Sequence, residues 1–560
     1  MIGVPRISRI VLPVALLLVL GSCGISRSIR DRPDISAYNA QIAERIRTSD
    51  STFILESNSL GRNEYGQWEL YVSGDPLERG LIIGSLTQEL YQYQEDIFLS
   101  KVEQLVPSKM KRSLLRKFLA WYNRKMHLNI PEEYKTEIFG LSNFASDDYN
   151  DIAEPYLRAL YLHGAHDIGH ALQDLALVGC SSFAVWGDRT DDGNLLIGRN
   201  FDFYVGDDFA KNKIISFIDP TEGHKFMSVS WAGMIGVVSG MNEHGLTVTI
   251  NAGKSKIPLV AKTPISIVTR EILQYASTLE EAIAIAKKRK VFVSESIMVG
   301  SARDKKAIVI EVAPHNFGVY DVPNSSQLIC SNHFQSKAYE SDKNNLRHQL
   351  ESHSQYRYAR MEELLDTHDK MTPEIAVDLL RDRKGLGDTN IGYGNEKALN
   401  QLLAHHGIVF KPEQRLVWVS ANPYQLGKFV AYDLKKIFGD STRSNSKKWL
   451  SDPIKNIEKD SFLYSQAYEN YEKFRKMGEE IKQAVYGDKA LSTTFIEEFR
   501  MLNPEYWETH YWIGRYYYEK KYYLAAQIAF EEANEKEITT VPQQEKVQRY
   551  IKKLKRKLKQ

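Results

Sequence analysis

The residue types best suited to chemistry lie around Cys180. A cysteine at the head of a predicted strand is followed by a turn and by a second strand that ends in Arg-x-x-Asp. The stretch reads Gly179-Cys180-Ser181-Ser182-Phe183-Ala184-Val185-Trp186-Gly187, then Thr190-Asp191-Asp192-Gly193, then Gly198-Arg199-Asn200-Phe201-Asp202. Such a hairpin would bring Arg199 and Asp202 back beside Cys180. A free thiol has a pKa of about 8.5, so attack on an acyl carbonyl at neutral pH needs a nearby base or positive potential.

Further polar motifs follow this hairpin in order along the chain. They are Gly240-Met241-Asn242-Glu243-x-Gly245-Leu246 leading to Asn251, then Ser331-Asn332-His333-Phe334, then Ser354-x-x-Arg357. The first would form a turn whatever the function. Arg360 stands three residues after Arg357 and is an alternative to it. The remaining cysteine of this region, Cys330, follows two apolar residues and is predicted to be packed in a core.

Together, the ordered motifs resemble the cysteine branch of the N-terminal-nucleophile (Ntn) hydrolases. Within that superfamily they are similar to the acyl-CoA:6-aminopenicillanic acid acyltransferase-like, peptidase C45-type family, and more distantly to choloylglycine hydrolases, penicillin V acylases and acid ceramidase. The resemblance covers about residues 179–434. It implies an α+β fold, namely a four-layer αββα sandwich with two antiparallel sheets. It implies no cofactor and no metal.

The resemblance also implies that the chain activates itself. Cleavage of the Gly179–Cys180 bond would give Cys180 a free α-amine, with an unperturbed pKa of about 7.7–8.0, which acts as the base for its own thiol. Asp202 would hold that amine, and Arg199 would favour the thiolate. The leading segment is expected to stay bound as one half of an α/β heterodimer.

The same resemblance assigns the remaining site residues. Asn251 and a backbone N–H are the expected oxyanion donors. Asn332 would lie beside the substrate or the oxyanion, and Arg357 would be a further active-site arginine. The expected reaction is hydrolysis or acyl transfer at a linear amide through a thioester on Cys180.

Two other classes stay open at this point. One is a non-enzymatic lipoprotein whose repeats bind a protein partner. The other is a metallohydrolase, because His163, His166 and His170 fall near one face of a predicted helix and could bind zinc. Within the favoured class, an esterase or phospholipase acting on membrane lipids is the variant.

The N-terminal residues predict that the protein is exported from the cytoplasm. Arg6 and Arg9 precede an apolar run that is too short to span a bilayer, and Leu20-Gly21-Ser22-Cys23 resembles a bacterial lipobox. Cys23 is therefore predicted to be lipidated, which anchors the protein in the bacterial cell envelope. The near balance of 73 Lys and Arg against 71 Asp and Glu gives no reason to expect nucleic acid as a partner.

A length of 560 residues predicts two or three domains. The predicted division is 1–23 signal peptide, 24–179 tether and mostly helical α segment, 180–436 catalytic domain, 437–457 linker, and 458–560 helical module. The module resembles a tetratricopeptide repeat at Ile513-Gly514, Tyr517, Ala526, Phe530 and Ala533, although His510 and Ile538 depart from that pattern. Its basic last helix is predicted to cap the module, or alternatively to lie against anionic lipid.

Overall fold

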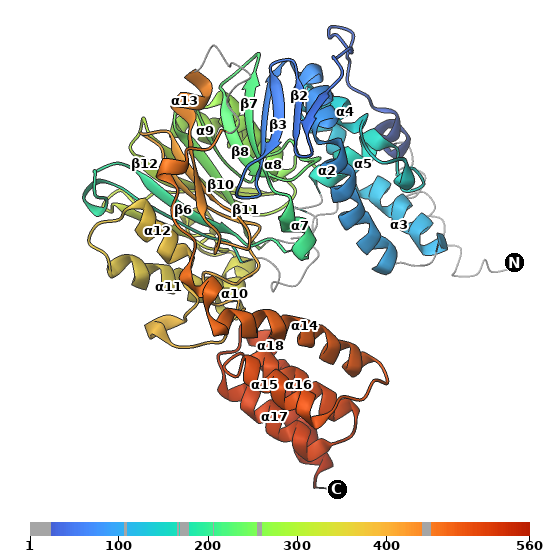
Figure 1. The fold of residues 1–560 in the computed structure, drawn as a ribbon, viewed down its shortest axis with the longest axis vertical. Helices are drawn as coiled ribbons and strands as arrows, with labels where there is room; N and C mark the ends of the chain where they lie inside the picture. The colour runs from blue at the N-terminus through green and yellow to red at the C-terminus, as the bar shows by residue number, and fades with distance from the viewer. Residues whose placement is uncertain are drawn as a thin grey trace, which may run out of the picture.

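The computed structural model describes residues 24–105, 109–164, 167, 179–204, 206–254, 260–439 and 450–559. Within residues 101–105 and 109–115 only the course of the backbone is described. Two β-sheets and a set of C-terminal helices dominate the part of the chain that is described (Figure 1).

The larger sheet has eleven strands in the order β1-β2-β3-β4-β7-β8-β9-β10-β11-β12-β13. Their bounds are β1 Ile46–Ser49, β2 Thr52–Leu55, β3 Asn58–Arg62, β4 Trp68–Gly74, β7 Ile214–Pro220, β8 Phe226–Ser230, β9 Ser239–Asn242, β10 Leu246–Ala252, β11 Glu295–Ser301, β12 Lys306–Ala313 and β13 Asn316–Tyr320. All neighbours in this sheet are antiparallel except β4 and β7, which pair in parallel from Trp68↔Ile214 to Gly74↔Pro220. That pair joins the segment before Cys180 to the segment after it.

The smaller sheet has six antiparallel strands in the order β14-β5-β6-β15-β16-β17. Their bounds are β5 Ser181–Val185, β6 Leu196–Phe201, β14 Gln327–Cys330, β15 His406–Lys411, β16 Leu416–Ser420 and β17 Phe429–Asp433. β5 and β15 are buried along their whole length, as expected for strands that are covered on both faces of the sheet.

Helices cover the outer face of each sheet. Over the larger sheet lie α2 Pro76–Leu105, α4 Glu132–Ser142, α5 Pro155–His163, α8 Ile265–Tyr275 and α9 Leu279–Lys288. Over the smaller sheet lie α11 Ser354–Asp366 and α12 Pro373–Leu380. The shorter or peripheral helices are α3 Lys109–Tyr122, α7 Asp207–Lys211, α10 Lys343–Glu351 and α13 Leu434–Gly439.

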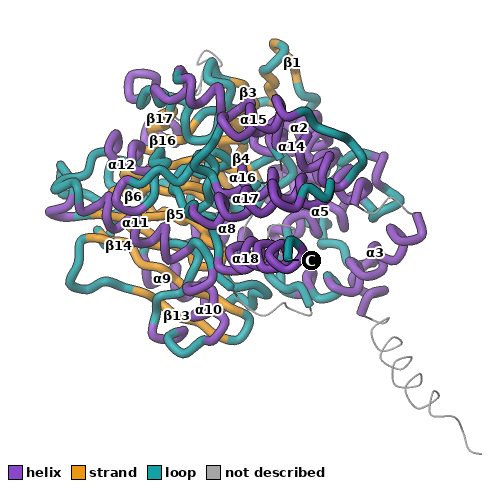
Figure 2. Tube along the Cα trace, turned by 90° about the horizontal axis from the view of Figure 1, so that it is seen from below, coloured by secondary structure: helices purple, strands orange, loops and turns teal. Residues whose placement is uncertain are grey.

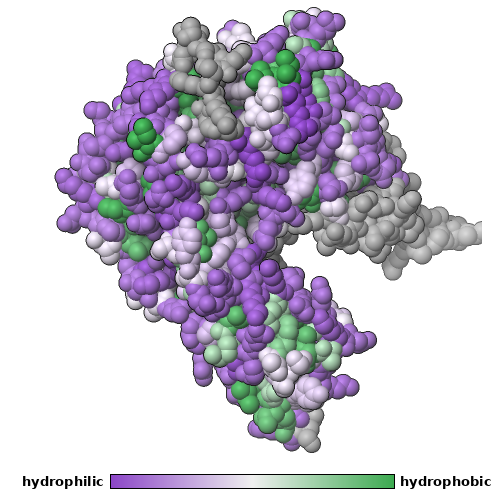
Figure 3. Space-filling model, viewed as in Figure 1, coloured by the Kyte–Doolittle hydropathy of each residue, from purple (hydrophilic) through white to green (hydrophobic). Residues whose placement is uncertain are grey.

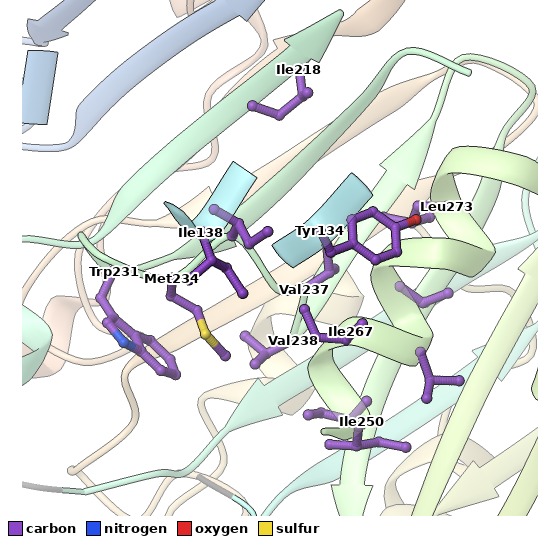
Figure 4. Close-up of a cluster of buried hydrophobic side chains, with 14 of the residues drawn as sticks. Tyr134, Ile138, Ile218, Trp231, Met234, Val237, Val238, Ile250, Ile267 and Leu273 are labelled. Atoms are coloured by element: carbon purple, nitrogen blue, oxygen red, sulfur yellow. The ribbon is translucent and has the colours of Figure 1, made fainter. Parts of the chain in front are cut away.

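Three apolar cores separate these layers. One packs helices against the larger sheet and includes Tyr134 and Ile138 from α4 with Ile218 and Leu273 (Figure 4). A second lies between the two sheets, and a third lies between the smaller sheet and α11 and α12. The predicted four-layer αββα sandwich is therefore confirmed.

Most predicted elements lie within two residues of the observed ones. The predicted strands are Ser182–Trp186, Leu195–Arg199, Phe226–Trp231, Leu246–Asn251, Ser296–Gly300, Ala307–Val312, Leu328–Ser331 and Leu416–Ser420, and each has a counterpart. The predicted helix Pro264–Lys288 is instead two helices, α8 and α9. The break has a local cause, because Thr278 caps α9 through a capping box with Glu281.

The segment after Cys23 differs from its prediction. Residues 24 to about 60 were expected to be an irregular tether, but β1, β2 and β3 begin within them, and with β4 they form one edge of the larger sheet. Their short length and polar residues hide the strand pattern. β1 is exposed throughout, and only alternate residues of β2 are buried.

The C-terminal helices form a body that lies below the sandwich in Figure 1 (Figure 1, Figure 2). They are α14 Gln466–Tyr486, α15 Thr493–Leu502, α16 Trp507–Glu519, α17 Tyr523–Glu535 and α18 Val541–Lys557. Val547 and Leu554 of α18 are buried in the apolar core of this module, so most of the apolar stripe of that helix packs inward. The helical C-terminal region is confirmed, whereas its assignment as a tetratricopeptide repeat stays a prediction.

The surface in Figure 3 is mostly hydrophilic over the sandwich, and apolar colour gathers on the C-terminal helices. Leu524 and Ile528, one turn apart on α17, are exposed. Among the residues that the structure describes, no helix combines the length and apolar character needed to cross a bilayer.

Candidate active site

The hairpin predicted around Cys180 is present, and it brings the expected cation to the thiol. Ser182 pairs with Arg199 across β5 and β6, and Cys180 directly precedes β5. The Nη2 atom of Arg199 lies 3.8 Å from Cys180 Sγ. The same guanidinium donates to Ser239 Oγ at 2.6 Å and to the carbonyl oxygen of Ile250, both in the larger sheet. The site therefore lies between the two sheets.

The thiol of Cys180 is sealed in the uncut chain. Cys180 is 1% exposed. Burial raises the pKa of Cys180 to about 11, although Arg199 pulls it down. Arg199 thus acts in the predicted direction, but the loss of water around the sulfur is the larger effect. The thiol is protonated at neutral pH in this state.

Asp202 follows β6 and lies beside the same sulfur. Its carboxylate raises the pKa of Cys180, and its backbone forms a hydrogen bond with the thiol. Within the described part of the chain, neither carboxylate oxygen of Asp202 has a hydrogen-bond partner, and both are buried. Burial raises the pKa of Asp202 to about 7, against the opposing effect of Arg357 and Arg199. A carboxylate with that pKa can exchange a proton near neutral pH.

Arg357 on α11 contacts the backbone of the nucleophile. Its Nη1 donates to the Cys180 carbonyl oxygen at 2.7 Å, and its Nη2 donates to Asn332 Oδ1 at 2.7 Å. Arg360 instead pairs with Asp382, Glu363 and Asp388 away from the site. Of the two arginines left open by the sequence, Arg357 is the one placed beside Cys180.

Asn251, at the end of β10, is also brought to the site, but its amide is already engaged. Its Nδ2 donates to the carbonyl oxygens of Cys330 at 3.0 Å and Ser331 at 3.1 Å, with a longer 3.4 Å contact to that of Cys180. Its Oδ1 accepts from Ser182. In the uncut chain Asn251 therefore ties the larger sheet to β14. Cys330 is buried in the core between the sheets, as predicted.

The structure adds residues that the sequence did not single out. Gln401 Nε2 donates to the Gly179 carbonyl oxygen at 2.9 Å. Ser239, which accepts from Arg199, also contacts His406 Nε2 at 2.9 Å. The residue types alone offer no signal for Gln401, because it lies on an irregular segment 222 residues from Gly179.

The histidine cluster considered for zinc is only partly described. His166 and His170 lie outside the described residues, as does Cys23. His163 is buried, its Nδ1 contacts the Ala159 carbonyl oxygen at 2.8 Å, and its Nε2 accepts from Ile235 N at 3.0 Å. Both ring nitrogens are thus occupied, which leaves His163 no ligand atom for a metal.

A different group has the geometry for a metal among the described residues. One ligand atom each from His224, Glu243 and His244 lies within 4.8 Å of the others. These residues flank β8 and β10, and His224 Nδ1 and His244 Nε2 lie 3.1 Å apart. Glu243 and His244 lie in the turn before β10, whereas Asn251 lies near the end of that strand, so the group is separate from the Cys180 site.

The two-sheet sandwich, with a cysteine at the head of an inner strand, is the arrangement expected from the resemblance to the Ntn hydrolases. Residues 189–422 match the family model described as acyl-coenzyme A:6-aminopenicillanic acid acyl-transferase. The matched region begins after Cys180 and contains Arg199, Asp202, Asn251, Asn332 and Arg357.

Two curated relatives match part of the chain. An uncharacterized protein from Archaeoglobus fulgidus is 29% identical over 274 residues, which cover 45% of this chain and 45% of that protein. The protein dcd1B from Dictyostelium discoideum is 23% identical over 194 residues, which cover 34% of this chain and 36% of that protein. The match therefore spans less than half the length of either relative.

Two solved structures are similar at a low level. An N-acylethanolamine-hydrolyzing acid amidase ortholog from Caenorhabditis elegans is 18% identical, with a TM-score of 0.30, covering 42% of this chain and 93% of that chain. A mutant conjugated bile acid hydrolase from Clostridium perfringens is 16% identical, with a TM-score of 0.32, covering 49% of this chain and 98% of that chain.

Proposed function

We propose that the chain is the precursor of a cysteine Ntn hydrolase that cuts its own Gly179–Cys180 bond and then cleaves linear amides through a thioester on Cys180. In the cut enzyme the freed α-amine of Cys180 takes the proton of its own thiol, and Asp202 holds that amine. Arg199 stabilises the thiolate. Water accepts the acyl group.

One observation carries this proposal. The peptide bond before Cys180 lies in the centre of the residue cluster: Gln401 contacts the carbonyl on one side of the nitrogen and Arg357 contacts the carbonyl on the other. A site built around one amide bond is suited to amide chemistry. The matched family, whose description names an acyl-transferase, supports acyl transfer as the reaction class.

The burial of the Cys180 thiol supports the proposal that the uncut chain is an inactive precursor. Cys180 is too buried to meet a substrate, and its raised pKa keeps it protonated. The buried carboxylate of Asp202, for which no partner is described, would gain one in the ammonium that the cut releases beside it. Cutting would therefore create both the base and its partner.

The proposal extends to location and partners. We propose that Cys23 carries a lipid that holds the enzyme in the bacterial cell envelope, outside the cytoplasm. The helices α14–α18 would then serve as a cover over the sandwich or as a docking surface for a protein partner. The esterase or phospholipase variant has less support, because the apolar residues Val547 and Leu554 of the basic last helix pack inward.

Intact mass tests the proposed self-cleavage. We expect the purified wild-type protein to give two masses, the second of them that of a fragment beginning at Cys180. The Cys180→Ala variant should stay whole, because no thiol is left to attack the Gly179 carbonyl.

The matched control is Cys330→Ala, which removes the other buried cysteine of the sandwich and should be cut like the wild type. A wild-type chain that stays whole, with a thiol that resists alkylation, would refute the self-processing mechanism. The helical module would then become the main functional feature.

A further inference from the structure

Gln401 occupies a defined place at the bond proposed to be cut. It lies on the irregular segment between α12 and β15 and is 2% exposed. Its Nε2 donates to the Gly179 carbonyl oxygen at 2.9 Å. Donors at about 2.7–3.1 Å are what an oxyanion hole requires. Its amide is thus placed where negative charge would develop if Cys180 attacked this carbonyl.

The fit between Gln401 and Gly179 is close. A Cβ atom on residue 179 would lie 2.0 Å from Gln401 Nε2 and 2.6 Å from Gln401 Oε1. A residue with a side chain at this position would therefore displace the amide. The glycine before the nucleophile is explained by this contact rather than by an unusual backbone conformation.

The other polar side chains of the site contact different atoms. Arg357 and Asn251 donate to the Cys180 carbonyl oxygen, one peptide unit beyond the bond. Arg199 contacts the sulfur. Among the side chains that the structure describes, Gln401 is the one with a hydrogen bond to the Gly179 carbonyl oxygen.

The C-terminal module holds the segment that carries Gln401. The adjacent Leu402 is fully buried in the apolar core formed by α14–α18. Asn395 Nδ2 donates to the Glu537 carbonyl oxygen at 2.9 Å, and Asn503 Nδ2 donates to that of Tyr393 at 2.8 Å. Helices far from the thiol thus fix the position of a side chain that touches the bond.

We propose that Gln401 is a catalytic residue of self-cleavage, the donor that stabilises the oxyanion on Gly179. This inference rests on the proposed function. Asp202 takes the thiol proton as Sγ bonds to the Gly179 carbonyl carbon, and the carbonyl electron pair moves to the oxygen that faces Gln401. The carbon–nitrogen bond then breaks, and the nitrogen takes the proton from Asp202. Water hydrolyses the resulting thioester, which leaves a Gly179 carboxylate and regenerates the Cys180 thiol.

Cell-free synthesis of the full chain, with the cut fraction followed over time, tests this role. Gln401→Ala should slow cutting by about 10²–10³-fold, the usual effect of losing one oxyanion donor. Gln67→Ala is the matched control: Gln67 is equally buried, and its Nε2 donates at 3.1 Å to the Val419 carbonyl oxygen. Gln67→Ala should be cut at the wild-type rate. Similar thermal unfolding midpoints of the two substitutions, each measured on the uncut Cys180→Ala chain, would separate catalysis from misfolding.

Hydroxylamine identifies the step, because it cleaves thioesters directly. Hydroxylamine should not speed the cutting of the Gln401→Ala chain, since without the donor the thioester forms too slowly to accumulate. Rapid cutting by hydroxylamine, or cutting of Gln401→Ala within about threefold of the wild type, would overturn the role of Gln401 in thioester formation. A wild-type chain that is never cut would instead refute the proposed function itself.

Discussion

Replacement of Asp202 by Asn is expected to slow self-cleavage by about 10²–10⁴-fold, the range attributed to a positioned general base. Before the cut, the α-nitrogen of Cys180 is part of a peptide bond and cannot act as a base. Asp202 is the carboxylate beside the sulfur, and burial raises its pKa to about 7. At that pKa it is a stronger base than an ordinary aspartate.

The pH dependence follows from the same shift. Below pH 7 the carboxyl is mostly protonated and cannot take the thiol proton, so the rate of cutting should rise as the pH passes through about 7 and level off above it. Asp202→Asn should lose this rise. Asp433→Asn, a substitution of a buried carboxylate on β17, is the control that should keep it. A wild-type rate that is constant between about pH 6 and 8 contradicts this assignment.

As the pH rises through about 7, the stability of the uncut chain should fall while the rate of cutting rises. Because the folded state binds the Asp202 proton more tightly than the unfolded chain, the stabilisation linked to this proton is complete below the usual aspartate pKa and is lost as the pH rises through about 7. Asp202→Asn removes that loss. On the uncut Cys180→Ala chain, adding Asp202→Asn should therefore leave the unfolding temperature at pH 8 unchanged or raise it, which separates a missing base from a damaged fold.

Replacement of Glu137 by Ala is expected to lower the free energy of unfolding by about 3–5 kcal/mol, since it leaves two buried guanidinium groups without their carboxylate. Glu137 on α4 pairs with Arg79 of α2 at 2.8 Å and with Arg270 of α8 at 3.2 Å. All three side chains are at most 1% exposed. Urea unfolding at pH 7 measures the effect.

A surface carboxylate of the same segment is the control. Glu89 pairs with Arg45, but its side chain is 60% exposed, so Glu89→Ala should cost no more than about 1 kcal/mol. A loss below about 1 kcal/mol for Glu137→Ala would show that the buried network is not a stabilising element.

The network should also fail in acid. Burial alone would raise the pKa of Glu137, but Arg270 and Arg79 hold it below its usual value. A lowered pKa means that the network stabilises the fold above the usual glutamate pKa and loses this effect as the pH falls through the folded-state value. The difference between wild type and Glu137→Ala should therefore shrink in strong acid.

Short-range sequence patterns predicted the site residues that are close together in the sequence. Cys180, Arg199 and Asp202 lie on one hairpin, so alternation and a turn were enough to bring them together. Asn251, Asn332 and Arg357 come from three distant elements, and their grouping was predicted only through the resemblance to a family. Neither the local patterns nor the family resemblance predicted Gln401. It lies on an irregular segment without a periodic pattern, and its contact with Gly179 depends on packing across the whole fold.

The sequence also did not predict how deeply the site residues are buried. The positive charge of Arg199 suggested a thiolate, whereas the sealed site keeps Cys180 protonated. Likewise, β1, β2 and β3 have only four or five residues each and are too short to be recognised alone. They join the larger sheet through β4, which pairs with β7.

The parallel pairing of β4 with β7 has a thermodynamic consequence. Seven residue pairs of that ladder, from Trp68↔Ile214 to Gly74↔Pro220, join strands from opposite sides of the Gly179–Cys180 bond. Cutting the bond leaves this ladder in place, so the fragments should remain one particle until they unfold. Unfolding of the cut protein then releases two molecules where the uncut chain releases one. The melting temperature of the wild type should therefore rise with protein concentration, whereas that of the uncut Cys180→Ala chain should not.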